Sequence, residues 1–196
     1  MAPGSASGYR AWLPEALGVD MMEIYVVRHG IAAPSEAGIP DRFRPLTSKG
    51  RRRFRRTARR FARLGRKLDL ILTSPLVRAV QTAEILVAAV KDGEVAVLEE
   101  LDPTSGVGPL LEVMARRADS RSVALVGHEP QLSGLVAVLT AILGNEIELR
   151  KGAIVRLDVA EALGPGSAEL RWTLNPLSKE VEKGSRGLGS HRGGSA

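Results

Sequence analysis

The sequence predicts an α/β protein, a three-layer α/β/α sandwich with a mainly parallel central sheet. Two patterns support this prediction: short apolar runs typical of buried strands, and longer segments between them in which apolar residues recur at helical spacing. Strands that alternate with helices pair in parallel, and the helices cover both faces of the sheet. The chain has 196 residues, 44% of them hydrophobic, which is enough to bury the core of one such domain. We expect that domain at residues 21–178, between flexible tails at 1–20 and 179–196.

The expected elements follow one another along the chain. Four apolar runs are expected to form buried strands, at residues 23–27, 70–73, 95–98 and 123–126. Three segments carry an apolar stripe at helical spacing, at residues 48–64, 75–90 and 130–143. The stripe of the first helix consists of Phe54, Ala58, Phe61, Ala62 and Leu64. Two later segments, 153–159 and 169–174, alternate apolar and polar residues, and we expect them to pair at an edge of the sheet.

The basic residues are concentrated in the first predicted helix. The chain has 28 Lys and Arg against 22 Asp and Glu, a net charge of +6. Eleven of the basic residues and none of the acidic ones lie at 49–67, so the rest of the chain has 17 basic against 22 acidic residues. This basic helix is either a solvated face or a binding site for an acidic partner, polyphosphate or nucleic acid. Specific nucleic-acid binding is not expected, because the aromatic residues of the segment, Phe54 and Phe61, belong to the apolar stripe.

Composition excludes several classes of site. The chain has no cysteine, so disulfides, thiolate nucleophiles and Cys-ligated metal centres are ruled out. The longest apolar stretch, at 132–143, is interrupted by polar and small residues and is too short to span a bilayer. The first twenty residues lack the apolar run of a secretory signal. We therefore expect a soluble, cytoplasmic protein with no membrane partner.

Basic and imidazole side chains follow three of the predicted strands. Arg28 and His29 come directly after the first strand, His128 follows the fourth, and Arg78 lies shortly after the second. Ligands of open α/β sheets bind at the carboxyl ends of the strands, so we expect these four side chains to converge there. Ser74 and Pro75 suit the N-cap and first position of the helix that carries Arg78, which places its free amide groups at the same edge.

Two guanidinium groups and imidazoles together predict a phosphate site. Between Arg28 and Arg78, the pKa of His29 should lie below its ordinary value, because like charges disfavour imidazolium. A neutral His29 could attack phosphorus in line and form a phosphohistidine that water then hydrolyses, while the arginines stabilise the charge on the phosphoryl oxygens. This chemistry requires no metal ion and no other cofactor.

These residues and their surroundings resemble the histidine phosphatase superfamily, and within it the small SixA-like phosphohistidine phosphatases. The resemblance covers residues 22 to about 176 and consists of six stretches in the same order: VVRHG, RPLTSKG, LILTSPLVRAVQTAE, LEELDP, VALVGHEPQL and WTLNP. It implies a phosphoglycerate-mutase-like fold and no metal ion. It also implies that His29 is the phosphorylated nucleophile and that Arg28, Arg78 and His128 bind the phosphate.

The sequence departs from the mutase-like branch of that superfamily. RHGIAAP lacks the Asn that follows RHG in that branch, and only about ten residues separate the second helix from LEELDP. These departures argue against a sugar-phosphate mutase and for an open site, which suits a phosphorylated protein side chain such as phosphohistidine. A nucleotide or small phosphomonoester phosphatase and a non-catalytic phosphate-binding regulatory module are the alternatives.

The proton donor has several candidates. Glu100 follows the third predicted strand, in the loop where the resemblance places a glutamate, and it is our preferred catalytic acid. Glu129, next to the second histidine, is the main alternative, and Glu99 and Asp102 are lesser ones. A phosphoramidate substrate such as phosphohistidine would need little help from any of them, because imidazole is a good leaving group.

Overall fold

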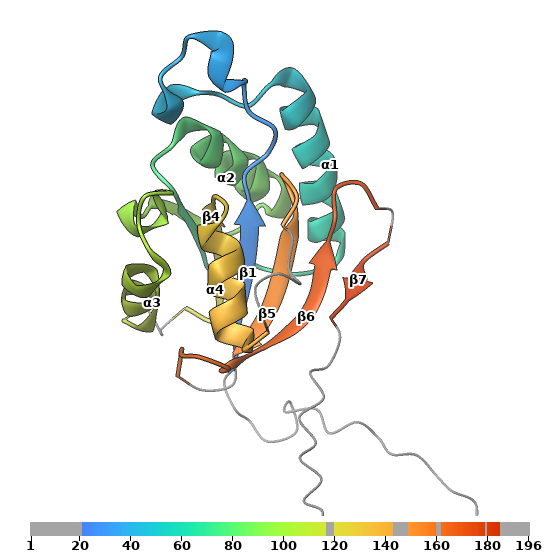
Figure 1. Cartoon of the computed structure of the whole chain (residues 1–196). Coiled ribbons are helices and arrows are strands. Elements are labelled where there is room, and N and C mark those ends of the chain that lie inside the picture. The colour runs from blue at the N-terminus through green and yellow to red at the C-terminus, as the bar shows by residue number, and fades with distance from the viewer. Residues whose placement is uncertain (1–20, 117–119, 143–148, 160–161, 179, 185–196) are drawn as a thin grey trace, which may run out of the picture.

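The computed structural model describes residues 21–116, 120–142, 149–159, 162–178 and 180–184, and these form three layers (Figure 1). Within them the central sheet has seven strands in the order β3-β2-β4-β1-β5-β6-β7. The first four of these pair in parallel, and β5, β6 and β7 add to the sheet as antiparallel neighbours. The strands are β1 (Met22–Arg28), β2 (Leu70–Thr73), β3 (Glu94–Val97), β4 (Ser122–Gly127), β5 (Ile154–Val159), β6 (Ala168–Leu174) and β7 (Glu182–Lys183).

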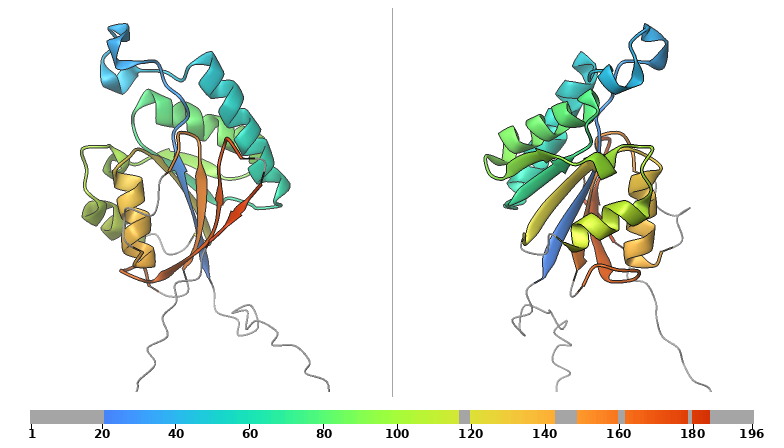
Figure 2. Two further views of the ribbon diagram at one scale, coloured as in Figure 1. Left: turned by 45° about the vertical axis from the view of Figure 1, so that its right-hand side comes forward. Right: turned by 90° about the vertical axis from the view of Figure 1, so that its left-hand side faces the viewer.

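Helices cover both faces of the sheet (Figure 2). One face is covered by α1 (Ser48–Arg63) and α2 (Val77–Val90), and the other by α3 (Val107–Ala115) and α4 (Gln131–Thr140). Successive side chains of β1 point to opposite faces of the sheet and so contribute to both hydrophobic cores. Tyr25 and Val27 pack towards α1 and α2, whereas Ile24 and Val26 pack towards α3 and α4. The predicted three-layer α/β/α architecture is therefore confirmed.

The basic helix α1 is held to the sheet by a narrow apolar stripe. Thr47 caps the helix by accepting a hydrogen bond from Gly50 N at 2.9 Å. Phe54 and Phe61 are buried, and the Phe61 ring meets Tyr25 of β1 edge to face with the ring centroids 4.9 Å apart. The prediction that Leu64 extends the stripe is wrong, because Leu64 follows the last turn of the helix and is 39% exposed.

Three features of the fold differ from the prediction. The strand expected at 95–98 is not buried: β3 pairs only with β2 at the edge of the sheet, and its Val97 is 55% exposed. The sequence analysis missed α3. It also placed β7 in a tail, whereas β7 pairs with β6 and Gly184 N donates to Arg171 O at 3.0 Å. The expected tail residues 1–20 and 185–196 lie outside the described residues.

Among the residues that the structure describes, no helix has the length and apolar character needed to cross a membrane.

Candidate active site

Three neighbouring strands deliver the predicted site residues to one edge of the sheet. Arg28 at the end of β1 pairs in register with Gly127 of β4. The next residues continue this arrangement, because His29 N donates to Gly127 O at 3.1 Å and Ser74 N donates to Val126 O at 2.9 Å. The histidine rings of His29 and His128 therefore lie side by side, with centroids 4.9 Å apart and planes inclined by 52°. The predicted convergence of these strand ends is confirmed.

The ring of His29 is buried, and among the described residues it makes one hydrogen bond. Its Nδ1 lies 2.6 Å from the carbonyl oxygen of Gly30, and a carbonyl can only accept, so Nδ1 carries the proton. In the neutral ring this leaves the lone pair on Nε2. The backbone of Gly30 is fixed in turn, because its N–H donates to Thr82 Oγ1 at 3.1 Å. A Cβ on Gly30 would also lie 3.2 Å from a methyl group of Leu46, so the close packing there favours glycine.

Burial keeps both histidines neutral. The pKa of His29 is lowered to about 3, first by desolvation, then by the neighbouring His128, and less by Arg78 and Arg28. The predicted direction is confirmed, but the predicted cause is not the largest one. The pKa of His128 is lowered to about 4, mainly by burial and then by Arg78. Near neutral pH each ring is therefore an uncharged imidazole, and in His29 the lone pair is on Nε2.

Ser74 positions His128 instead of capping a helix. Helix α2 begins at Val77, and its N-cap residue is Leu76, so the prediction that Ser74 and Pro75 start the helix is wrong. The Ser74 hydroxyl accepts from Leu76 N at 3.3 Å and lies 2.8 Å from His128 Nε2. Within the described part of the chain, His128 Nδ1 is buried and has no partner. Of the two ring nitrogens, Nε2 is therefore the one that Ser74 positions.

Arg78 is buried and faces an acidic side chain that the sequence analysis did not single out. Its Nη1 donates to the backbone oxygen of Asp41 at 2.7 Å, and its Nη2 lies 2.9 Å from Asp41 Oδ2. Asp41 belongs to the short helix η3 (Asp41–Phe43) in the excursion at residues 29–47, which rises above the sheet edge (Figure 1). Arg44 and Arg78 hold the pKa of Asp41 below its usual value. A carboxylate therefore occupies one side of the guanidinium predicted to bind phosphate.

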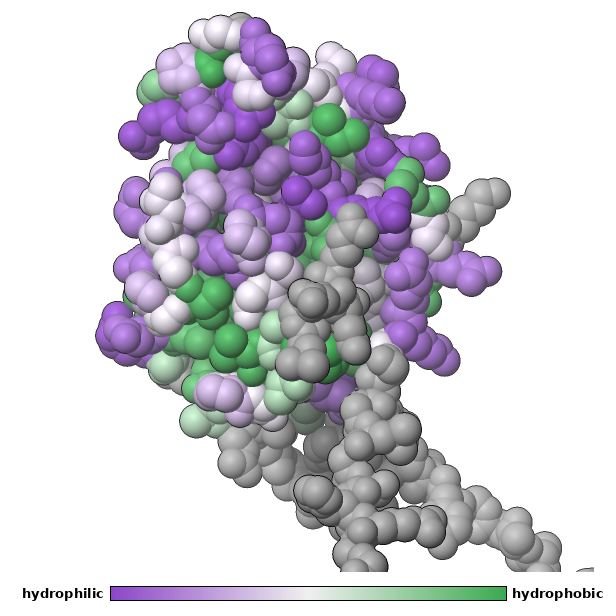
Figure 3. All heavy atoms as spheres, viewed as in Figure 1, coloured by the Kyte–Doolittle hydropathy of each residue, from purple (hydrophilic) through white to green (hydrophobic). Residues whose placement is uncertain are grey.

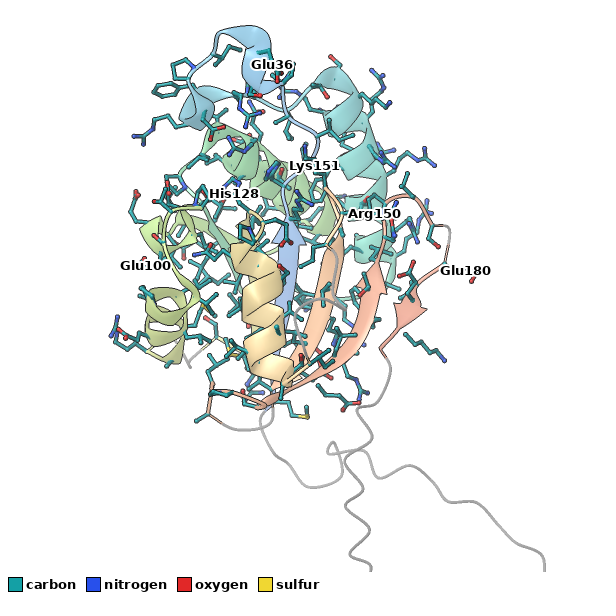
Figure 4. The ribbon with its side chains drawn as sticks, in the orientation of Figure 1. Glu36, Glu100, His128, Arg150, Lys151 and Glu180 are labelled. Atoms are coloured by element: carbon teal, nitrogen blue, oxygen red, sulfur yellow. The ribbon has the colours of Figure 1, made fainter. Side chains whose placement is uncertain are left out.

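Arg28 connects the site to a neighbouring turn. Its Nη1 donates to Leu149 O at 2.6 Å, and its Nε is buried without a partner among the described residues. The same side chain lines a groove together with Arg150 and Lys151, which the sequence analysis did not select. Figure 4 shows these two cations beside the carboxyl end of β1.

The four candidate acids lie in different environments. Glu100 is half-buried in η4 (Glu99–Leu101), and its backbone oxygen accepts from Gln131 Nε2 at 2.7 Å at the start of α4 (Figure 4). Within the described residues its carboxylate makes no hydrogen bond. One carboxylate oxygen of Glu129 accepts from Ser133, and the other is buried without a partner there. Asp102 accepts from Thr104, which lowers its pKa, and its charge acts on His128. Glu99 is exposed.

In the part of the chain that the structure describes, no group of three His, Cys, Asp or Glu side chains is placed to hold a metal ion.

Comparisons with known proteins identify the family. A family model described as "Histidine phosphatase superfamily (branch 1)" matches residues 24–106. An uncharacterized protein of Picosynechococcus sp. is 40% identical over 139 residues, which are 69% of this chain and 84% of that protein. Phosphohistidine phosphatase SixA of Escherichia coli is 28% identical over 166 residues, covering 83% of this chain and 99% of SixA. The chain belongs to the histidine phosphatase superfamily.

Solved structures of other phosphatases share the fold. The protein histidine phosphatase SixA complexed with tungstate matches with a TM-score of 0.71 and 28% identity, over 79% of this chain and 97% of that one. The alpha-ribazole phosphatase of Shigella flexneri matches with a TM-score of 0.64 at 17% identity, which shows a common fold only. The expected phosphoglycerate-mutase-like histidine phosphatase fold and the resemblance to SixA are confirmed, and the protein is a phosphohydrolase.

Proposed function

We propose that this histidine phosphatase removes phosphate from phosphohistidine in a protein, through a phosphohistidine intermediate on His29 and without a metal ion. The observation that carries the proposal is the state of His29. The Gly30 carbonyl holds the proton on Nδ1, and burial keeps the ring neutral, so Nε2 is a free nucleophile between two arginines. Arg28, Arg78 and His128 bind the phosphoryl oxygens.

The reaction has two steps. In the first, His29 Nε2 forms a bond to phosphorus as the bond from phosphorus to the nitrogen of the substrate imidazole breaks, and the leaving imidazole takes up a proton. In the second, water attacks phosphorus, the bond to His29 breaks and inorganic phosphate leaves. The guanidinium groups stabilise the charge on the equatorial oxygens in both steps. Glu100 supplies the proton to leaving groups that are poorer than imidazole.

Two observations favour a protein-borne substrate. The connection between β3 and α3 consists of little more than the short helix η4, so only a short segment stands beside the site on this side. The relative from Escherichia coli that aligns over 83% of this chain bears the name phosphohistidine phosphatase. A phosphorylated imidazole at the surface of another protein can enter such a site more readily than it could enter a deep pocket.

The test is a substrate panel with the purified protein in EDTA. A histidine-phosphorylated protein, an aryl phosphate, a nucleotide and a sugar phosphate are compared by kcat/KM. We expect the phosphoprotein to be the best substrate and EDTA to have no effect. Preference for the nucleotide or sugar phosphate would refute the substrate, and inhibition by EDTA would refute the metal-free mechanism. Turnover of the aryl phosphate by His29→Ala at the wild-type rate would refute the nucleophile.

A further inference from the structure

A basic groove adjoins the candidate active site on the side away from Glu100. It has a volume of about 360 Å³ and is lined by Arg28, Ile31, Arg53, Arg150, Lys151, Pro176 and Leu177. Four of these seven residues are cationic and none is acidic. Arg28 belongs to both the groove and the predicted phosphate site, so the two are adjacent. Glu100 comes from the β3 side of the sheet, whereas Arg150 and Lys151 precede β5 on the other side (Figure 4).

The turn that carries Arg150 and Lys151 is fixed to the catalytic strand. Gly152 N donates to Arg28 O at 3.0 Å, and Arg28 N donates to Ala153 O at 3.2 Å. The side chain of Arg28 adds a third link through Leu149 O. Gly152 has a φ of 85°, a left-handed conformation that glycine adopts without strain, which lets the turn close tightly. The backbone that carries the two cations is thus fixed relative to β1.

The opposite wall of the groove is also anchored. Arg60 of α1 donates to the backbone oxygens of Asn175 at 3.1 Å and Ser178 at 2.7 Å, which fixes the chain on both sides of Pro176 and Leu177. A groove with walls held in this way loses little conformational entropy when a ligand binds.

Among the residues that the structure describes, no acidic side chain pairs with the exposed cations of the groove. Within the described residues, the side chains of Arg53, Arg150 and Lys151 form no hydrogen bond or ion pair. Arg150 and Lys151 are exposed. Basic side chains of the same molecule, such as Arg60 and Arg156, are by contrast engaged in structural contacts. Three cations around one groove that have no partner in the described part of the chain favour an anionic ligand.

We propose that this groove binds an acidic segment of the protein substrate, next to the phosphorylated side chain in the active site. The proposal rests on the proposed function and extends it, because it states which phosphoproteins are preferred. Glutamate or aspartate residues beside the phosphorylated histidine would pair with Arg53, Arg150 and Lys151. The groove would thereby set substrate specificity, whereas Arg28, Arg78 and His128 bind the phosphate that every substrate shares.

The apolar part of the groove favours a peptide over a small polyanion. Leu177 is 59% exposed, and Ile31 and Pro176 lie beside the cations. Hydrophilic side chains gather over the upper half of the face seen in Figure 3, with a few apolar ones among them. A segment of acidic and apolar side chains would bury such a mixed surface, whereas a chain of phosphates would leave the apolar part uncovered.

The experiment compares two synthetic peptides with a single phosphohistidine, one flanked by Glu and one by Gln at the same positions. Each is measured as a competitive inhibitor of aryl phosphate hydrolysis, which reports binding whether or not the peptide is itself dephosphorylated. For the wild type we expect a Ki about tenfold lower for the Glu peptide, because exposed ion pairs each contribute a few-fold in affinity. In the double variant Arg150→Glu, Lys151→Glu the difference should disappear, while KM for the aryl phosphate changes less than about twofold.

A matched control keeps the same change in net charge. Arg63→Glu with Lys67→Glu reverses two exposed charges, the first about 15 Å along α1 from Arg53, and it should retain the preference for the Glu peptide. Equal Ki values for the two peptides with the wild type, or loss of the preference in the control, would overturn the proposal. A preference for the Glu peptide without its dephosphorylation would support the groove and refute the proposed function. Dephosphorylation of both peptides with equal Ki values would do the reverse.

Discussion

Asp41 Oδ2 lies 2.9 Å from Nη2 of Arg78, on a guanidinium that is buried beside both histidines. If Arg78 binds the phosphoryl group as proposed, the contact places a carboxylate where an oxygen of that group would bind, and phosphate and Asp41 would compete for the same guanidinium. Arg78 would keep its position without that carboxylate, because its Nη1 is held separately by the backbone oxygen of Asp41 at 2.7 Å.

Asp41→Asn should therefore strengthen phosphate binding. The expected change is a Ki for inorganic phosphate about two- to fivefold lower than in the wild type, since the Asp41 side chain is largely exposed and its ion pair is screened. Glu169→Gln, which removes an exposed carboxylate from the ion pair with Arg171 on β6, should leave Ki unchanged. Weaker phosphate binding by Asp41→Asn would show that the carboxylate orients Arg78 and does not compete with the ligand.

Ser74→Ala should impair the site through His128. The substitution leaves His128 Nε2 without its 2.8 Å partner, so the ring loses its fixed orientation. We expect kcat/KM to fall by up to about tenfold and the free energy of unfolding by about 1–3 kcal/mol. Ser122→Ala serves as the control, because it removes a buried hydroxyl that donates to Lys67 O at the start of β4, at the other end of that strand from His128. Unchanged kinetics in Ser74→Ala would show that His128 is held by packing alone.

Substrates with different leaving groups can show whether Glu100 or Glu129 is the proton donor. If Glu100 donates the proton, Glu100→Gln should lower kcat/KM for an alkyl phosphate by about 100-fold or more, because an alkoxide is a poor leaving group. The same variant should act on a phosphohistidine peptide nearly as well as the wild type does. Glu129→Gln is tested in parallel, and a larger loss there with alkyl phosphates would assign the acid to Glu129.

The buried histidines predict acid sensitivity of the fold. The pKa values of about 3 for His29 and about 4 for His128 lie below the ordinary value of 6.5 that applies in the unfolded chain. Between these limits the unfolded chain binds more protons than the folded protein, so stability is lost as the pH falls below 6.5. Each histidine contributes about 1.4 kcal/mol per pH unit to that loss.

Urea unfolding at pH 7 and pH 5 measures this effect. The midpoint should be lower at pH 5, and the drop should be smaller for His29→Gln, which lacks one of the two titrating rings. An equal drop for the wild type and the variant would mean that His29 is not buried in its neutral form.

The sequence could predict the convergence of His29, Arg78 and His128, because parallel strands in a βαβ arrangement end at one edge whatever their loops do. It could not predict the contact between Asp41 and Arg78. Asp41 lies in an irregular segment without hydrophobic periodicity, and it is 37 residues from Arg78 in the sequence. Ser74 was misassigned because a serine before a proline suits a helix start, and its alignment with His128 depends on the register of β2 and β4.

Other differences have equally physical causes. An apolar run of four residues does not reveal whether its strand is central or at an edge, so the exposure of Val97 could not be foreseen. The partner of Arg28 is a backbone oxygen 121 residues away, and a backbone group leaves no mark in a sequence. Arg150 and Lys151 belong to a turn without a recognisable motif. Their proposed role depends on their place beside Arg28, which only the folded structure shows.

The most direct test of the account is to locate the covalent phosphate. The protein is mixed with a phosphohistidine peptide or aryl phosphate, quenched in alkali, which preserves phosphohistidine, and mapped by mass spectrometry in parallel with His29→Asn and His128→Asn. We predict phosphate on His29 in the wild type, lost on exposure to acid, and none in His29→Asn. Phosphate on His128, or wild-type turnover by His29→Asn, would contradict the assignment of His29 as the nucleophile.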